Sequence, residues 1–337
     1  MILRRESIYI IIVILLIAGY IFSAKIESMQ NTTNNVEVDQ NVKEEPASLV
    51  IVYPVPEFLE FAGERVYLDD PDLRERFDNE IIVNTHFHSS TIFMIKKANR
   101  WFPQMRPVLE KYGIPEDFLY LSMIESGLNN DKSPVGAVGF WQFLPSTARE
   151  LGLEVTSQVD ERYDPIKSTE AACKYLLKAK EKVGSWTNTM AAYNMGTRGF
   201  VNEMERQKID SYYDLLLNEE TSRYVFRVLS IKQIMENQER YGFNIPKNEL
   251  YPIEEVRIIE IDKTIPDLTE FAFSQGINYK ILKRHNPWLR NNSLMVRSSN
   301  KTYSIRIPKD NNNPAEANIR DIDSIMIISD RMRIQEL

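Results

Sequence analysis

The sequence contains only one cysteine, Cys173, among its 337 residues. A disulfide within the chain is therefore impossible, and no cysteine lies beside the N-terminal apolar segment to carry a lipid. Cys173 lies among alanine and leucine residues in TEAACKYLLKAK, which predicts a buried and unreactive thiol. The stability of the fold must therefore come from its hydrophobic core.

Histidine is also scarce, and acidic residues outnumber basic ones. His86 and His88 in NTHFHSS would share one side of a strand, but the only other histidine is His285. We therefore expect no metal site and no cofactor. Lysine and arginine number 41 against 48 aspartate and glutamate, a net charge of -7, and this balance makes nucleic acid an improbable partner.

One long apolar run lies near the N-terminus. Arg4 and Arg5 precede the segment from Ile8 to Phe22, which has the layout of a signal peptide or a short membrane anchor. Bulky residues at its end make a poor cleavage site, so we predict that residues 1–24 stay as an anchor; a buried core helix is the alternative. Positive residues before the run predict that the rest of the chain lies outside the cytoplasm.

The rest of the chain divides by composition and periodicity. Residues 25–79 begin as a polar tether and are predicted to form a linker and lead-in. Residues 80–245 carry apolar residues at helical spacing, which predicts one all-α domain of six or seven helices. Residues 250–310 follow the order strand, helix, helix, strand, and residues 311–337 form a tail without an assigned structure. The predicted fold class is mainly α with a small α+β C-terminal domain.

Residues typical of helix ends punctuate the helical region. Gly113, Gly184 and Gly196 follow apolar helical segments and are expected just after helix C-termini. Ser168 is expected as the N-cap of the helix that contains Cys173.

Glu125 is the candidate for acid chemistry. Pro115 fits the first turn of a helix that places Phe118, Leu121 and Glu125 on one face. A carboxyl group among apolar side chains is destabilised when it ionises, so its pKa rises and it can donate a proton near neutral pH. The general acid of glycosidic-bond cleavage needs this property. Taken alone, the pattern also fits a glutamate at a helix end that reaches solvent.

Two further segments, GFWQFLPST and AAYNMG, combine aromatic rings with amides, as sugar-binding sites do, and a third, TSRYVFRVL, places a tyrosine among apolar residues. The candidate residues are Phe140, Trp141, Gln142, Tyr193, Asn194 and Tyr224. Taken singly, the aromatic residues fit a hydrophobic core equally well, and the asparagine fits a helix cap.

In this order, the motifs IESGLN (124–129), GFWQFLPST (139–147), AAYNMG (191–196) and ETSRYV (220–225) resemble those of the soluble-lytic-transglycosylase-like family. Within it, they are most similar to the membrane-bound lytic murein transglycosylases of the D type. The resemblance covers about residues 95–242 and implies a goose-lysozyme-like catalytic fold that acts on peptidoglycan.

The resemblance also implies roles for single residues. Glu125 corresponds to the catalytic acid/base, and Ser126 is the second residue of the family's Glu-Ser pair. The residues implied to line the glycan groove are Gln142, Tyr193, Asn194 and Tyr224. The family's Gly-Leu-Met-Gln stretch is Gly139-Phe140-Trp141-Gln142 here, so the aromatic pair departs from the pattern.

The family mechanism needs one carboxyl group. The glutamic acid protonates the leaving oxygen and then takes the proton of the MurNAc C6 hydroxyl, which closes a 1,6-anhydro ring. A two-carboxylate glycosidase would need a second acid. The candidates are Asp131, Asp160, Glu161 and Asp164, which lie in segments typical of caps and loops.

Residues 255–307 resemble a divergent LysM module, in which HNPWL keeps the familiar centre but EIDKTIPDL replaces the opening signature. Glycan binding and a packing or partner-docking role are both open for it. For the whole chain, the alternatives to a lytic transglycosylase are a lysozyme-like muramidase and a non-catalytic scaffold that binds the wall.

Overall fold

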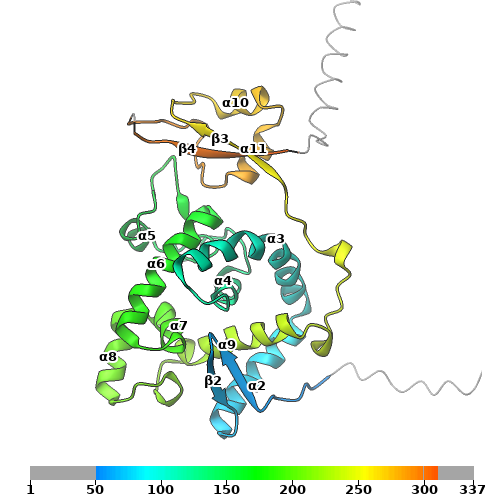
Figure 1. Cartoon of the computed structure of the whole chain (residues 1–337), viewed down its shortest axis with the longest axis vertical. Coiled ribbons are helices and arrows are strands. Elements are labelled where there is room, and N and C mark those ends of the chain that lie inside the picture. Colours follow the sequence, from blue (N-terminus) through cyan, green and yellow to red (C-terminus); the bar gives the residue numbers. More distant parts are fainter. Residues whose placement is uncertain (1–50, 299, 310–337) are drawn as a thin grey trace, which may run out of the picture. The chain divides into compact units, whose positions relative to one another are not determined.

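The computed structural model describes residues 51–298 and 300–309 (Figure 1). Helices dominate these residues, so the predicted mainly α class is confirmed. The helices before residue 245 are α2 (Pro71–His86), α3 (His88–Tyr112), α4 (Phe118–Ser126), α5 (Pro145–Glu150), α6 (Pro165–Val183), α7 (Trp186–Met195), α8 (Thr197–Gln207) and α9 (Glu219–Glu236).

A β-hairpin and a helix precede the region in which helices were expected. Strands β1 (Phe58–Phe61) and β2 (Glu64–Tyr67) pair antiparallel, and Leu59 and Phe61 are buried in the core of the helical domain. Helix α2 begins at Pro71 and packs along α9. Residues 25–79 were predicted as a linker and lead-in without strands or helices, so the predicted start of the helical domain at residue 80 is wrong. Strands of four residues are too short for their alternation to stand out from a loop.

The helix ends follow their capping chemistry, with one correction. Gly113 and Gly184 follow the last residues of α3 and α6, as predicted. Ser168 is not the N-cap of α6, because it lies within the helix and its hydroxyl donates to the carbonyl oxygen of Asp164. The Asp164 side chain is the cap instead, and it accepts the backbone N–H of Ile166. Proline at the next position favours this earlier start.

The two neighbouring histidines do not lie on a strand. His86 is the last residue of α2 and His88 is the first residue of α3, and their rings stack with centroids 6.4 Å apart. The expectation that they share one side of a strand is therefore wrong. The polar residues around them fit the tight junction between two helices.

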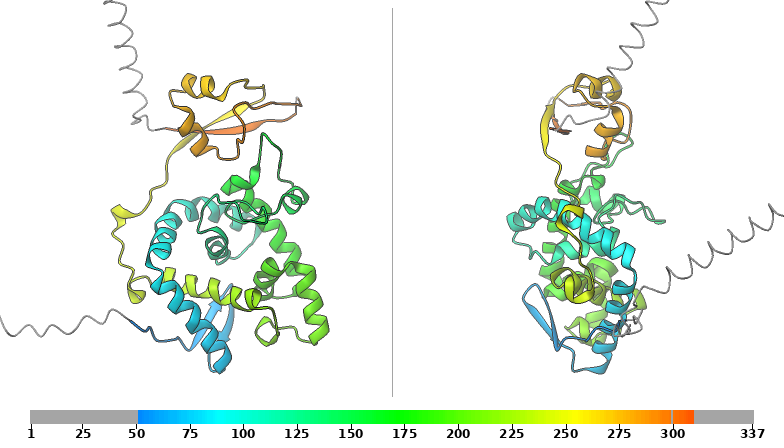
Figure 2. Two further views of the ribbon diagram at one scale, coloured as in Figure 1. Left: turned by 180° about the vertical axis from the view of Figure 1, so that it is seen from behind. Right: turned by 90° about the vertical axis from the view of Figure 1, so that its right-hand side faces the viewer.

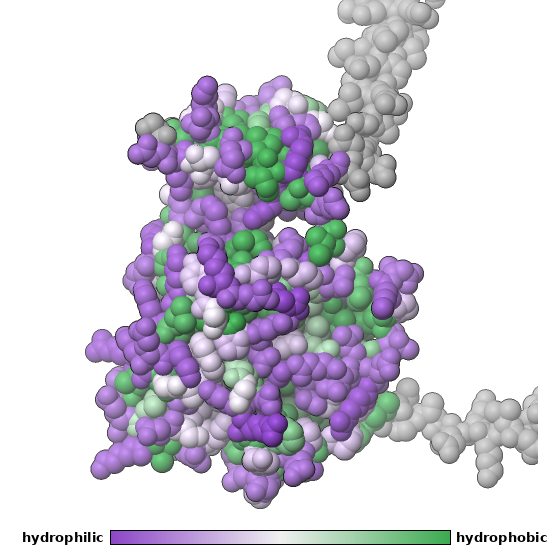
Figure 3. Space-filling model, viewed as in Figure 1, coloured by the Kyte–Doolittle hydropathy of each residue, from purple (hydrophilic) through white to green (hydrophobic). Residues whose placement is uncertain are grey.

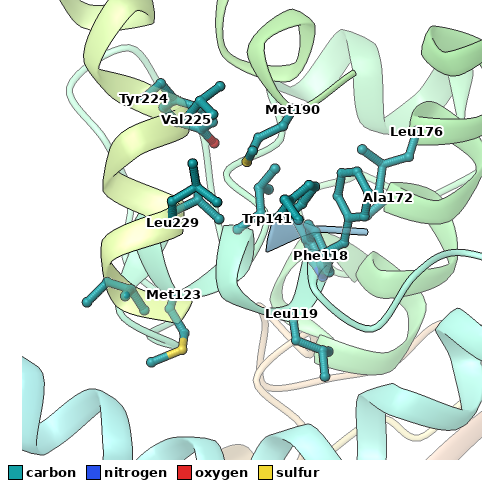
Figure 4. Close-up of a cluster of buried hydrophobic side chains, with 14 of the residues drawn as sticks. Phe118, Leu119, Met123, Trp141, Ala172, Leu176, Met190, Tyr224, Val225 and Leu229 are labelled. Carbon is teal, nitrogen blue, oxygen red and sulfur yellow. The ribbon is translucent and has the colours of Figure 1, made fainter. Parts of the chain in front are cut away.

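Helix α4 lies at the centre of the helical domain. It contacts α3 and α9, and longer helices surround it in the views from the front and from behind (Figure 1, Figure 2). Phe118, Leu119 and Met123 lie among other buried apolar side chains (Figure 4), and Leu121 is buried as well, so this short helix is apolar on nearly every side. A helix with apolar residues all round is stable only inside a core. The core therefore fixes the position of the residue at its C-terminal end.

The C-terminal elements follow the predicted order. They are β3 (Val256–Ile261), α10 (Leu268–Ser274), α11 (Tyr279–His285) and β4 (Tyr303–Pro308). The two strands pair antiparallel, with Ile261 opposite Tyr303. Their small core also includes Val159 from the helical domain.

Backbone hydrogen bonds connect the segment around Val159 to the C-terminal elements. The N–H of Asp160 donates to the carbonyl oxygen of Trp288 at 2.9 Å, and the N–H of Arg290 donates to that of Gln158 at 2.7 Å. The Arg306 guanidinium of β4 also pairs with the buried carboxylate of Asp164 at 2.7 Å. The residue that caps α6 thus also holds β4.

The surface of the described residues is mostly hydrophilic on the face drawn in Figure 3, with hydrophobic residues in small groups. Across residues 51–298 and 300–309, no helix combines the length and the hydropathy needed to cross a bilayer. The predicted anchor at residues 8–22 and the tail at residues 311–337 lie outside the described residues.

Candidate active site

Helix α4 ends by placing Glu125 in a cleft. Gly127 and Leu128 follow the helix with φ angles of +59° and +56°, so two consecutive left-handed residues turn the chain away. Leucine rarely adopts this conformation, and its burial in the core holds it there. The strained turn fixes the last turn of α4 and the direction of the Glu125 side chain.

The cleft has a volume of about 630 Å³ and gathers residues that are far apart in the sequence. Of the candidate site residues named from the sequence, five line it: Glu125, Gln142, Tyr193, Asn194 and Tyr224. They come from α4, from the loop before α5, from α7 and from α9. The ordered motifs therefore meet at one place in the fold.

The carboxyl group of Glu125 is held in a partly apolar setting. Burial is the largest influence and raises its pKa from the usual 4.5 to about 7. The Tyr224 hydroxyl donates a hydrogen bond to Glu125 Oε1, which favours the ionised form. The positive charge of Arg227 acts in the same direction, whereas Glu220 opposes it. The group can therefore give up and take back a proton near neutral pH, as predicted from its apolar neighbours.

Two α7 residues form the wall beside the acid. The Tyr193 hydroxyl donates to the carbonyl oxygen of Trp141 at 2.6 Å, and burial raises its pKa well above the usual value. Asn194 accepts the Thr221 hydroxyl at 2.8 Å and donates to Glu220 at 3.2 Å. Each side chain is thus fixed in the cleft by a contact outside its own helix.

The backbone of Gln142 lies in the left-handed region with a φ angle of +48°. Hydrogen bonds from its side-chain amide stabilise this conformation. Its Nε2 donates to the carbonyl oxygens of Gly139 at 2.8 Å and Asp131 at 3.2 Å. Both amide protons are engaged, so Oε1 is the atom that can accept a bond from a ligand. Gly139 is needed beside it, because a Cβ there would lie 2.1 Å from the carbonyl oxygen of Arg162.

Three candidates do not face the cleft. Phe140 is 2% exposed and Trp141 is fully buried, so the expectation that they form a platform for a sugar ring is wrong. They pack in the core instead, and the Trp141 indole donates to the Thr169 hydroxyl. Ser126 does not line the cleft; its hydroxyl donates to the carbonyl oxygen of Phe140 at 3.1 Å. These residues hold the loop that carries Gln142.

The four acidic residues weighed as a second catalytic carboxylate do not line the cleft. Asp160 pairs with Arg162, Glu161 pairs with Lys167, and Asp164 caps α6. Asp131 also lies outside the lining. Their capping and loop assignment from the sequence fits this arrangement.

Sequence reasoning missed two charged residues of the cleft, Glu220 and Arg227. Both lie on α9 and flank Tyr224 by one helical turn, four residues before it and three after it. This spacing was the available signal. Residues four positions before and three positions after a given helix residue lie on the same face, so a tyrosine that faces the acid predicts that these two residues also face the cleft.

Comparisons with known proteins match two parts of the chain. The family model described as the transglycosylase SLT domain matches residues 106–215. The model of the soluble lytic transglycosylase C-terminal LysM-like domain matches residues 257–311. The chain contains an SLT domain and a LysM-like domain. The SLT match includes Glu125, Gln142, Tyr193 and Asn194 and ends before α9.

The chain is also homologous to membrane-bound lytic murein transglycosylase D of Escherichia coli strain K12. The two sequences are 26% identical over 244 residues, which cover 69% of this chain and 52% of the relative. The chain thus spans about half the length of this relative. The alignment is longer than the SLT match alone.

Two solved structures are similar in part. One is the 70 kDa soluble lytic transglycosylase of Escherichia coli, with 22% identity, a TM-score of 0.32, and coverage of 43% of this chain and 26% of that one. The other is an inactive mutant of the lytic transglycosylase Slt of Pseudomonas aeruginosa, with 18% identity, a TM-score of 0.33, and coverage of 54% and 35%.

Proposed function

We propose that this protein is a lytic transglycosylase that cleaves the β-1,4 bond between MurNAc and GlcNAc in peptidoglycan without water. The observation that carries the proposal is the carboxyl group of Glu125, which has a pKa of about 7 and faces a cleft beside Tyr224. A carboxylic acid that is protonated near neutral pH can act as a general acid towards a glycosidic oxygen. The SLT domain supports the same reaction class.

The reaction would use Glu125 twice. The protonated carboxyl group gives its proton to the glycosidic oxygen, the bond to the anomeric carbon breaks, and the GlcNAc strand leaves. The N-acetyl group of the substrate supports the positive anomeric carbon. The C6 hydroxyl of MurNAc then attacks that carbon, and the Glu125 carboxylate takes the hydroxyl proton. The products are a 1,6-anhydroMurNAc end and a regenerated acid.

The other cleft residues would orient the glycan and the acid. Tyr224 holds the carboxyl group of Glu125 through its hydroxyl. Gln142 offers Oε1 to a sugar hydroxyl or amide, and Tyr193 and Asn194 form the facing wall. Because fixed donors and acceptors need no rearrangement during the reaction, they stabilise its transition state efficiently.

We further propose that catalysis, wall binding and membrane anchoring belong to different parts of the chain. The catalytic domain extends from the hairpin at Phe58 to about residue 245, and the LysM-like domain at about 250–310 contributes to wall binding. Residues 8–22 would anchor the protein to the inner membrane with the enzyme on the periplasmic side. The resemblance to a membrane-bound murein transglycosylase supports this location.

A muramidase that uses water is the second candidate. Glu220 favours it, because this carboxylate lines the same cleft as Glu125 and could hold a water molecule in a two-carboxylate mechanism. Against this reading, Glu220 is exposed and accepts a hydrogen bond from Asn194.

The products distinguish the candidates. Purified sacculi are digested with the protein, and the soluble muropeptides are analysed by mass spectrometry. We expect anhydro ends, lighter by one water than the hydrolysed species. Reducing ends alone would establish the muramidase.

Variants separate an enzyme from a non-catalytic scaffold. Glu125→Gln keeps the shape of the side chain but carries no proton to donate, so we expect no soluble products. Glu205→Gln on α8 is the matched control, because Glu205 is exposed and lies outside the cleft. Full turnover by Glu125→Gln would refute the assigned role of the acid.

A further inference from the structure

The groove that contains Glu125 continues along α9. Glu220, Tyr224 and Arg227 are spaced four and three residues apart on this helix, so they share one face, and all three line the cleft. Glu220 and Arg227 also line a second hollow of about 630 Å³, together with Arg223 and residues of α2. Arg227 therefore lies where the two hollows adjoin.

The two arginines of this groove differ in their partners. Arg223 Nε donates to Glu80 Oε1 at 2.6 Å, and Glu80 is only 2% exposed. The Arg223 guanidinium therefore forms a structural ion pair with a buried carboxylate. Arg227 is half-buried, and among residues 51–298 and 300–309 no carboxylate oxygen lies within 4.0 Å of it. Its charge lowers the pKa of Glu125, which places it within electrostatic reach of the acid.

A half-buried guanidinium without a counter-ion is suited to a ligand. The planar fork of arginine matches a carboxylate through two parallel hydrogen bonds, and such bonds are stronger than neutral ones. Glu220 would oppose an anion, but it is exposed and already accepts from Asn194. Salt and solvent screen an exposed charge far more than a half-buried one.

We propose that Arg227 binds a carboxylate carried by the MurNAc substituent and so makes acidic glycans the preferred substrate class. This inference rests on the proposed function, which supplies the glycan. The carboxylate has two possible sources. In strands stripped of peptide it is the free lactyl group, and in native strands, where the lactyl group is an amide, it belongs to the peptide stem.

Binding measurements on the full-length chain test the proposal without turnover. In a Glu125→Gln background, titration calorimetry compares Arg227 with Arg227→Gln on three GlcNAc–MurNAc tetrasaccharides. The first has free lactyl carboxylates, the second has lactyl methyl amides, and the third carries peptide stems. We expect Arg227→Gln to weaken binding of a carboxylate ligand about tenfold or more, and binding of the neutral methyl amide by less than about twofold.

The ligand that responds identifies the source of the carboxylate. A loss for the first tetrasaccharide alone assigns the lactyl group, and a loss for the third assigns the stem. Arg198→Gln is the charge-matched control, because Arg198 is exposed on α8, and it should leave all three affinities unchanged.

Equal effects of Arg227→Gln on all three ligands, no effect, or no binding by any ligand would overturn the proposal. The proposed catalysis is judged separately, by the anhydro products of the wild-type chain. A protein that makes these products but shows no carboxylate preference would retain the function and lose only the role of Arg227.

Discussion

Replacement of Glu125 by glutamine should stabilise the protein in a way that depends on pH. Folding raises the pKa of this carboxyl group, chiefly through burial. The folded chain therefore holds the proton more tightly than the unfolded chain does. As the pH rises, ionisation in the unfolded state comes first and draws the equilibrium towards unfolding.

The size of the effect follows from the two pKa values. The usual value is 4.5 and the folded value is about 7. At about 1.4 kcal/mol per pH unit, ionisation of Glu125 lowers the free energy of unfolding by about 3 kcal/mol in full, and this loss is called the ionisation penalty. The penalty is absent below the unfolded pKa, grows between the two values, and is complete above the folded one. Between about pH 5 and about pH 8 it increases by about 2.5 kcal/mol.

Urea denaturation of the wild type and of Glu125→Gln at these two pH values measures this increase. Glutamine does not ionise, so the variant lacks the penalty. The free energy of unfolding of the variant minus that of the wild type should therefore be about 2.5 kcal/mol larger at about pH 8 than at about pH 5. Any change in the hydrogen bond with Tyr224 adds a nearly constant offset, which the comparison removes.

The same offset at both pH values would refute the reasoning. It would mean that the Glu125 carboxyl group is solvated in the folded protein, and that it lacks the raised pKa on which the proposed acid chemistry depends. Glu205→Gln, at an exposed position of α8, is the matched control variant.

Two further outcomes are expected from the site. Tyr224→Phe removes a hydrogen bond that favours the ionised form, so the pKa of Glu125 should rise; the alkaline limb of the pH profile of glycan cleavage should move up by about one pH unit or less. An unchanged or lowered limb would contradict this. Gly139→Ala should destabilise the fold by at least about 2 kcal/mol, because its Cβ would meet the carbonyl oxygen of Arg162. Gly136→Ala has a similar φ but open space, so thermal unfolding should show a smaller loss of about 1 kcal/mol.

Local chemistry made much of the fold predictable from the sequence. The apolar positions of α4 and the order of the C-terminal strands and helices follow from periodicity, which is a property of single segments. The N-cap of α6 was wrong by four residues, because Asp164 and Ser168 both fit a cap and the choice depends on Pro165 between them.

Site residues were predicted correctly where the sequence pattern fits one structural environment, and less well where the residue type suits both a hydrophobic core and a binding surface. Glu125 and Tyr224 were correctly brought together by the order of the motifs. Phe140 and Trp141 were placed in the wrong environment, because an aromatic ring serves a core as well as a sugar-binding surface, and only packing decides between them. Arg227 was missed because a single arginine on a helix is usually a solvated surface charge, and only its spacing of three residues from Tyr224 pointed to the cleft.

The solitary cysteine has a practical consequence for experiments on the cleft. Burial raises the pKa of the Cys173 thiol to about 12, so almost no thiolate is present at neutral pH to react with maleimides or spin labels. A cysteine introduced at an exposed position would thus be the only thiol that such labels modify, with the rest of the sequence unchanged. Fluorescent reporters could then be placed at the rim of the groove, and glycan entry could be followed in real time without first removing any native residue.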